Sequence, residues 1–236
     1  MHLNSLSLIN FKNIQQIEIN FSNRVNCFIG NNGQGKTNLL DAIYHLSYTK
    51  SFFNSIDSQN IMFDQSFYVI QGDVSVESEN FSLYCALKKG DKKIFRKNKK
   101  VYKKLADHIG FFPVVMITPY DINLVLEGSE TRRKFLDAFI AQFDKSYIQE
   151  LIQYNKLLKQ RNALLKISHN ADSSELMEVY QIQMEEKAHF IYKRRSDFVC
   201  DFIPLFNKFY KDISSENENV GLNYISALEH NSMKDI

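Results

Sequence analysis

The sequence has no tryptophan and few cysteines, prolines and glycines: three, three and eight, respectively, in 236 residues. The three cysteines, Cys27, Cys85 and Cys200, are far apart, which excludes a closely spaced metal-binding or redox-active pair. Each has apolar neighbours, so we expect three buried, reduced thiols, as is usual in cytoplasmic proteins. The six histidines are scattered and form no pattern typical of metal ligands.

Long hydrophobic stretches are also missing. The longest apolar run, from Phe111 to Ile117, is interrupted by Pro113 and is far too short to cross a bilayer. The N-terminus, Met-His-Leu-Asn-Ser, has neither the basic nor the apolar segment of an export signal. The sequence therefore predicts a cytoplasmic protein with no membrane partner.

Positive charge is concentrated in one block. The formal net charge is +2, but residues 88–104 hold ten Lys or Arg and one acid, a local net charge of +9 that leaves −7 for the rest of the chain. Such a block can neutralise nucleic-acid phosphates, with Phe95 and Tyr102 stacking on unpaired bases. Alternatively, it is a solvated pair of strands whose lysines alternate between two faces. The sequence leaves both interpretations open.

A phosphate-binding loop is the most specific motif. Residues 30–37 read Gly-Asn-Asn-Gly-Gln-Gly-Lys-Thr and match the pattern G-x-x-x-x-G-K-[ST], between an apolar run and a stretch with helical spacing. In this pattern glycines let backbone N–H groups approach phosphate oxygens, the lysine reaches the β- and γ-phosphates, and the threonine ligates Mg²⁺. We therefore predict a nucleoside triphosphate site formed by Gly30, Asn31, Asn32, Gly33, Gln34, Gly35, Lys36 and Thr37, with Thr37 as the metal ligand.

The first half of the chain has the alternation of apolar and polar residues that is typical of strands. The turn Lys88-Lys89-Gly90-Asp91 predicts a hairpin between the segments that flank it. An N-terminal hairpin is expected before the loop as well. The predicted strands cover residues 6–8, 17–21, 25–29, 68–70, 81–87 and 114–117.

The second half has the spacing of long helices. No glycine occurs between Gly128 and Gly221, and Asp144 with Ser146 offers N-cap side chains for a break between two helices. A polar stretch, residues 169–174, separates the second helix from a third, which predicts an antiparallel helical arm.

Five blocks of sequence resemble the RecF family of bacterial DNA replication and repair ATPases, and together they cover most of the chain. The first two are shared with the heads of SMC and Rad50 proteins, whereas the last two are much more specific to RecF. The blocks are Leu-Ile-Asn-Phe-Lys-Asn at 8–13, the loop and its helix at 30–43, Tyr-Thr-Lys-Ser-Phe at 48–52, Gly-Ser with Arg-Arg-Lys-Phe-Leu-Asp at 128–137, and Gln-Arg-Asn-Ala-Leu-Leu-Lys at 160–166.

The resemblance implies an α/β fold: an ABC-type P-loop ATPase head, with a mixed sheet around the first helix, and a helical arm domain. We expect the N-terminal lobe of the head at 1–127, the arm at 128–213, and a return to the head at 214–236 through a strand at 222–225. The resemblance also implies ATP and Mg²⁺ as cofactors, with Lys12 and Asn13 bordering the nucleotide.

The implied function is ATP-controlled binding of single-stranded or gapped DNA in replication and recombinational repair. The implied partners are DNA, a second copy of the chain in an ATP-dependent homodimer, and the proteins RecR and RecO. The alternatives are an SMC/Rad50-like repair ATPase head, or a non-catalytic fragment that binds nucleotide or DNA.

No catalytic residue is predicted within the sequence. An ABC-type head needs a signature segment and a Walker B strand that ends in acids. The candidates fail, because Val114–Ile117 is followed by Thr118 and because Asp201 lies in a helical stretch. We expect both elements beyond this chain, so that it is the N-terminal part of a longer ATPase and is itself inactive.

Two further features have more than one interpretation. The basic run Arg132-Arg133-Lys134 opens a helix, where positive charge is poorly placed, and it either meets an anionic partner or forms ion pairs with Glu127 and Glu130. Asp41 follows the loop on its helix, and we expect it to make contacts at the helix surface and to take no part in catalysis.

Overall fold

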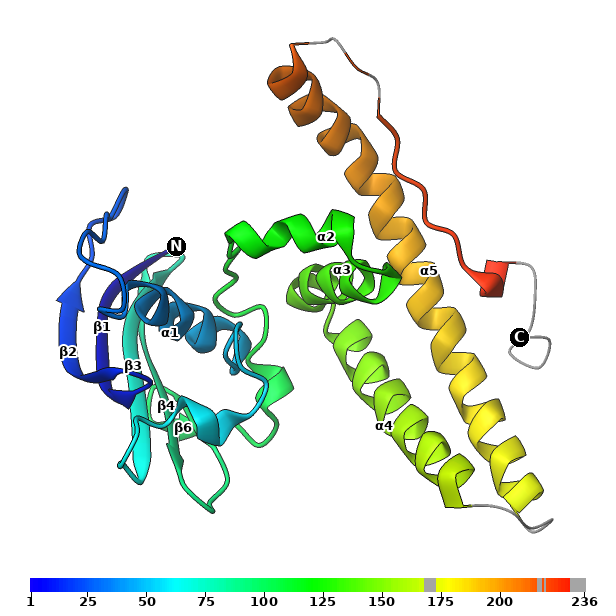
Figure 1. Ribbon diagram of the computed structural model, residues 1–236, viewed down its shortest axis with the longest axis horizontal. Helices are drawn as coiled ribbons and strands as arrows, with labels where there is room; N and C mark the ends of the chain where they lie inside the picture. The colour runs from blue at the N-terminus through cyan, green and yellow to red at the C-terminus, as the bar shows by residue number, and fades with distance from the viewer. Residues whose placement is uncertain (168–172, 216–217, 219, 230–236) are drawn as a thin grey trace. The chain divides into compact units, whose positions relative to one another are not determined.

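The computed structural model describes residues 1–167, 173–215, 218 and 220–229. The chain divides into two compact units, Met1–Asp121 and Ile122–Ile236 (Figure 1). The domain boundaries predicted at residues 127 and 213 stay predictions. Most of the polar stretch predicted at 169–174 lies outside the described residues.

The first unit contains a six-stranded antiparallel sheet with the strand order β2-β1-β3-β4-β5-β6. The two predicted hairpins are confirmed: β1 pairs with β2, and the turn after Lys88 joins β4 to β5. The strands are β1 (His2–Phe11), β2 (Ile14–Asn20), β3 (Phe67–Val76), β4 (Glu79–Lys88), β5 (Ile94–Lys97) and β6 (Lys100–Val101). A short 3₁₀ helix, η1 (Asp57–Asn60), precedes β3, and two more, η2 (Leu105–Asp107) and η3 (Pro119–Ile122), follow β6.

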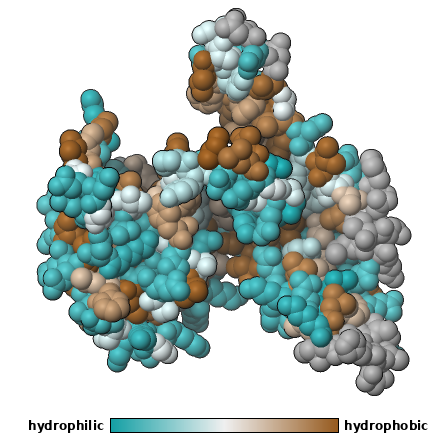
Figure 2. Space-filling model, in the orientation of Figure 1, coloured by the Kyte–Doolittle hydropathy of each residue, from teal (hydrophilic) through white to brown (hydrophobic). Residues whose placement is uncertain are grey.

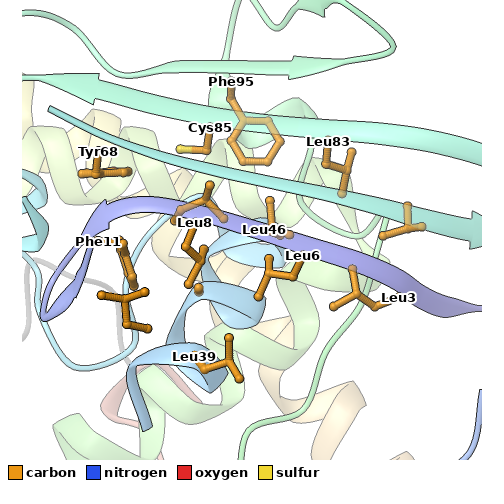
Figure 3. Packing of buried hydrophobic residues seen from close by; sticks show 14 of the residues in the cluster. Leu3, Leu6, Leu8, Phe11, Leu39, Leu46, Tyr68, Leu83, Cys85 and Phe95 are labelled. Atoms are coloured by element: carbon orange, nitrogen blue, oxygen red, sulfur yellow. The ribbon is translucent and has the colours of Figure 1, made fainter. Parts of the chain in front are cut away.

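One helix, α1 (Lys36–Tyr48), covers one face of this sheet (Figure 1). Side chains alternate along a strand, so every second residue of the central strands faces α1 and is buried. Figure 3 shows Leu6 and Leu8 of β1 together with Leu46 of α1 in this core. The core fixes α1 against the sheet, and it thereby fixes the start of α1 where the phosphate loop ends.

Two predicted strands are wrong. Residues 25–29 and 114–117 form no strand in the first unit, all of which the structure describes. Val25 is 77% exposed and Ile29 94% exposed, and Ile117 is 84% exposed. A strand needs a neighbouring strand for its backbone N–H and C=O groups, and neither segment pairs with a strand of the sheet.

The prediction of three buried thiols is correct only for Cys85, which lies in the sheet core. Burial raises the pKa of this thiol to about 12. Cys27 is exposed because the segment before the phosphate loop is irregular, and Cys200 is exposed on the surface of a helix.

The second unit is helical. Its helices are α2 (Asn123–Leu126), α3 (Ser129–Phe143), α4 (Lys145–Ile167) and α5 (Ser173–Ser214), with a 3₁₀ turn, η4 (Ala227–Glu229). The predicted break is confirmed, since Asp144 Oδ1 accepts hydrogen bonds from the backbone N–H groups of Ser146 and Tyr147 at 2.9 and 3.0 Å. Helices α4 and α5 lie side by side, as expected for the arm.

Apolar side chains are exposed on the last turns of α5, among them Leu205, Phe209 and Ile213 (Figure 2). The strand predicted at 222–225 is wrong, because these residues have no regular structure. Tyr224 instead stacks on Tyr192 of α5, with ring centroids 5.9 Å apart. No helix in the described part of the chain is long and apolar enough to span a membrane.

Candidate nucleotide-binding site

The phosphate loop enters α1 through a glycine in the left-handed region. Gly33 has φ 82° and Gly35, the N-cap of α1, has φ 97°, a conformation that side-chain-bearing residues rarely adopt. At Gly35 a Cβ atom would also lie 2.8 Å from Asn13 Oδ1. Both the backbone angle and the close neighbour therefore require glycine at this position.

The start of α1 presents free hydrogen-bond donors. The N-cap makes no side-chain hydrogen bond, and the first intrahelical bond runs from Leu39 N to Gly35 O at 2.9 Å. The N–H groups of the first turn, at Lys36, Thr37 and Asn38, consequently lack intrahelical acceptors. Together with the helix dipole, these donors favour an anion such as a phosphate group.

Lys36 is held across the loop. Its Nζ donates to Gly30 O at 2.7 Å and to Asn31 O at 2.8 Å. An ammonium has three donors, so this arrangement keeps the charge over the loop backbone and leaves one donor for a ligand. Thr37 is exposed in the first turn of α1, where its hydroxyl is open to a metal ion.

Asn13 ties the loop to the sheet. Its Nδ2 donates to Gly33 O at 2.7 Å, and its Oδ1 accepts from Asn38 Nδ2 at 2.7 Å. The β1–β2 turn thus braces both the middle of the loop and the first turn of α1. The structure brings Asn13 to the loop, and its contact with a nucleotide stays a prediction.

Lys12, unlike Asn13, points toward Asp41 of α1 and not toward the loop. Its Nζ lies 2.6 Å from Asp41 Oδ2 and 5.4 Å from the centre of the Phe53 ring. The Asp41 carboxylate also accepts from Ser51 Oγ at 2.6 Å and from Phe52 N at 2.7 Å. Lys12 therefore joins the β1–β2 turn to α1 and to the segment after it, and its predicted place beside the nucleotide stays a prediction.

The expectation that Asp41 lies at the helix surface is wrong, because its side chain is fully buried. A carboxylate can be buried at this site because Lys12 and two hydrogen-bond donors compensate its charge. The sequence holds a sign of this role, since Asp41 is the one charged residue between Asn38 and Thr49.

Two histidines in the first unit are buried and uncharged. Burial lowers the pKa of His45 well below its usual range, and Lys93 and Lys12 lower it further. Burial also lowers the pKa of His108, to about 4. Its Nε2 donates to Leu46 O at 2.7 Å, so its Nδ1 accepts from the Tyr102 hydroxyl at 3.2 Å. No cluster of His, Cys, Asp or Glu able to hold a metal ion occurs among the described residues.

The basic block lies on the last strands of the sheet and the turns between them. Phe95 is only 1% exposed, and Tyr102 is half-buried with its hydroxyl bonded to His108 Nδ1. Neither ring is therefore open to a nucleic-acid base, contrary to the stacking that the sequence suggested. Lys93 is paired with Asp57 at 2.7 Å. The exposed lysines of the block are Lys88, Lys89, Lys92, Lys99, Lys100, Lys103 and Lys104.

The basic run at the start of α3 is satisfied locally. Arg132 Nη1 donates to the backbone oxygens of Leu124 and Glu127, both at 3.0 Å. Lys134 pairs with Glu130 at 2.7 Å, and both side chains are 73% exposed. These contacts favour the interpretation as a local network over one that needs an anionic partner.

Comparisons of the chain with a protein-family model, with curated relatives and with solved structures agree with this geometry. The family model described as an AAA ATPase domain matches residues 1–232. The chain is 48% identical over its whole length to the DNA replication and repair protein RecF of Phocaeicola vulgatus, and 47% identical over 97% of its length to that of Flavobacterium johnsoniae. A solved structure of RecF-ATPrS, a recombination mediator protein of the RecFOR pathway, superimposes with a TM-score of 0.85 over 91% of the chain and 58% of that structure, at 32% identity.

The chain therefore belongs to the family of AAA ATPase domains. Within that family its sequence is similar to those of the RecF proteins, and it spans about 64% of the length of the curated relatives that it matches. The predicted resemblance and the predicted fold class, an α/β ATPase head with a helical region, are both confirmed. The sheet predicted around the first helix was mixed, whereas every pair among the described strands is antiparallel.

Proposed function

We propose that this chain binds Mg-ATP and is the nucleotide-binding part of a DNA replication and repair protein that acts as a recombination mediator. The observation that carries the proposal is the loop: an uncapped N-terminus of α1 next to Lys36, whose Nζ is held over the loop by two carbonyls. The relatives' names, and a second solved structure described as RecF-ATP with a TM-score of 0.84, support the choice of ATP and of repair.

The residues present fit Mg-ATP. The backbone N–H groups of residues 30–37 and the first turn of α1 would hold the phosphates, and Lys36 would contact the β- and γ-phosphates. The hydroxyl of Thr37 would be one ligand of Mg²⁺, which neutralises phosphate charge when bound. The side chains of Asn31, Asn32 and Gln34 are exposed along the loop and complete its rim.

Titration calorimetry with Mg-ATP tests this proposal. Lys36→Ala removes a charge-assisted contact to phosphate worth roughly 1.5–3 kcal/mol, so affinity should fall about tenfold or more. Lys145→Ala removes an exposed lysine of the second unit and should leave affinity unchanged. Equal affinity in the Lys36 variant and the wild type would show that the loop is not the binding site.

We propose further that the intact protein works in the cytoplasm, binds single-stranded or gapped DNA, and forms a homodimer when ATP is bound, with RecR and RecO as protein partners. The support is the family membership and the basic block of the first unit. Light scattering with and without Mg-ATP tests dimerisation. Fluorescence anisotropy with gapped and fully paired DNA tests the substrate, and binding should weaken steeply as salt rises.

A further inference from the structure

The face of the sheet opposite α1 is an open surface. The strand register places six residues of β3, β4 and β5 on it in two adjacent rows: Val69, Ala86 and Ile94 in one, and Gln71, Tyr84 and Arg96 in the next. The buried residues of the same strands point to the other face, toward α1. No other α-helix occurs in residues 1–121, all of which the structure describes.

This face is apolar and aromatic at its centre. Ile94 is 40% exposed, and Phe67, one row further along β3, is 39% exposed. The guanidinium carbon of Arg96 lies 5.2 Å from the centre of the Tyr84 ring, so a planar cation lies over an aromatic ring. Flat aromatic and guanidinium groups are the surfaces on which unpaired bases stack.

Cations flank the apolar rows at both ends. Lys88 pairs with Phe67 in the register and shares its face, and Lys89 and Lys92 follow in the exposed turn. At the other end, Lys99 lies in the exposed turn of the β5–β6 hairpin, whereas Lys100 pairs with Lys97 and shares its face. Asn98, next to Lys99, donates its backbone N–H to Ser82 O, and Ser82 is six residues from Lys88 on β4, which separates the two cationic ends by about 20 Å. Charge is therefore complementary to a polyanion that crosses the apolar rows.

We propose that this sheet face binds single-stranded nucleic acid, with bases stacked on Phe67, Tyr84 and Arg96 and phosphates at Lys88 and Lys99. The inference rests on the proposed DNA-binding function and names the surface that performs it. A paired duplex hides its bases within the stack, so a flat sheet can offer this kind of contact only to unpaired bases. A neutral or basic protein partner would gain nothing from the surrounding lysines.

The test compares a labelled 30-residue oligothymidine with an abasic strand of the same length, measured by anisotropy on the intact protein with Mg-ATP. The wild type should bind the abasic strand about tenfold or more weakly, because the stacked bases are lost. The double variant Phe67→Ser with Tyr84→Ser should bind oligothymidine about tenfold more weakly and should no longer distinguish the two strands. Circular dichroism checks that this variant is folded.

Two single substitutions separate charge from stacking. Arg96→Lys keeps the charge but loses the plane, so it should reduce the preference for bases and leave the dependence on salt in place. Lys97→Gln is the matched control, since Lys97 faces the opposite side, with its Nζ 4.0 Å from the Phe111 ring centre, and should keep the preference. If the wild type binds no oligothymidine, the proposed DNA-binding function fails together with the surface. If the wild type binds oligothymidine more tightly than the abasic strand, and the variants of this face keep the same preference, the DNA-binding function stands and only the proposed surface is wrong.

Discussion

The guanidinium of Arg195 holds the carboxylate of Asp137 through two parallel hydrogen bonds, Nε to Oδ1 and Nη2 to Oδ2, each 2.8 Å long. The Tyr147 hydroxyl donates to the same carboxylate, and the Tyr224 hydroxyl lies 3.4 Å from Arg195 Nη1. The group joins α3, α4 and α5 to the segment beyond them. Asp137 ends one of the sequence blocks that resemble RecF, so the block has a structural role in the second unit.

Asp137→Ala should destabilise the second unit by about 3 kcal/mol or more, because it leaves Arg195 with an unpaired charge while the side chain is only 14% exposed. Arg194→Gln is the matched control. Arg194 also pairs with an aspartate, Asp144, but its side chain is 45% exposed, so its loss should cost less than about 1 kcal/mol. Urea unfolding followed by circular dichroism measures the free energy of unfolding of both variants. Equal losses of stability would contradict the structural role assigned to the pair of Asp137 and Arg195.

Asn13→Ala should lower the affinity for Mg-ATP about fivefold, because the loop loses its brace to the β1–β2 turn. A neutral hydrogen bond contributes about 1 kcal/mol, which corresponds to a factor of about five. Asn38→Ala removes only the bond between the two asparagines and keeps the one to Gly33 O, so its effect should be smaller. Titration calorimetry with Mg-ATP on both variants measures whether Asn13→Ala weakens binding more than Asn38→Ala does.

The sequence predicted the parts of the fold that depend on local pattern. The alternation in β1, β3 and β4, the turn after Lys88 and the cap at Asp144 all depend on neighbouring residues, and the structure has all of them. The segments at 25–29 and 114–117 are apolar enough for strands, but strand formation depends on a partner that local pattern cannot supply. The partner of Lys12 was missed for a related reason, since its pairing with Asp41 joins residues 29 positions apart.

Asp41→Asn should destabilise the first unit by about 3 kcal/mol, because it leaves the Lys12 ammonium without its counter-charge in a largely buried position. Lys134→Gln removes one partner of the pair with Glu130, in which both side chains are 73% exposed, and it should cause no measurable change in stability. Thermal unfolding of both variants at neutral pH checks this difference. A fall in melting temperature as large for Lys134→Gln would contradict it.

Stability should fall as the pH drops from 6.5 toward 4. The pKa of His108 is about 4 when folded, against about 6.5 when unfolded, so between these values the unfolded chain binds more protons and is favoured. The contribution is fully present above pH 6.5 and declines by on the order of 3 kcal/mol as the pH falls to 4. His108→Gln should reduce the slope of unfolding free energy against pH in this window.

The 236-residue chain alone should bind ATP but hydrolyse it no faster than background. Phosphoryl transfer depends on a complete metal shell and on a group that positions the attacking water. The loop supplies Lys36 and Thr37, but Asp41, the acid on α1, is buried and already bound to Lys12, Ser51 and Phe52. Val114–Ile117 is irregular and ends in no acid, and Asp201 lies within α5. A coupled ATPase assay on this chain, with Lys36→Ala as the control for contaminating activity, measures the rate. Turnover that depends on Lys36 would show that the catalytic acids lie within these 236 residues after all.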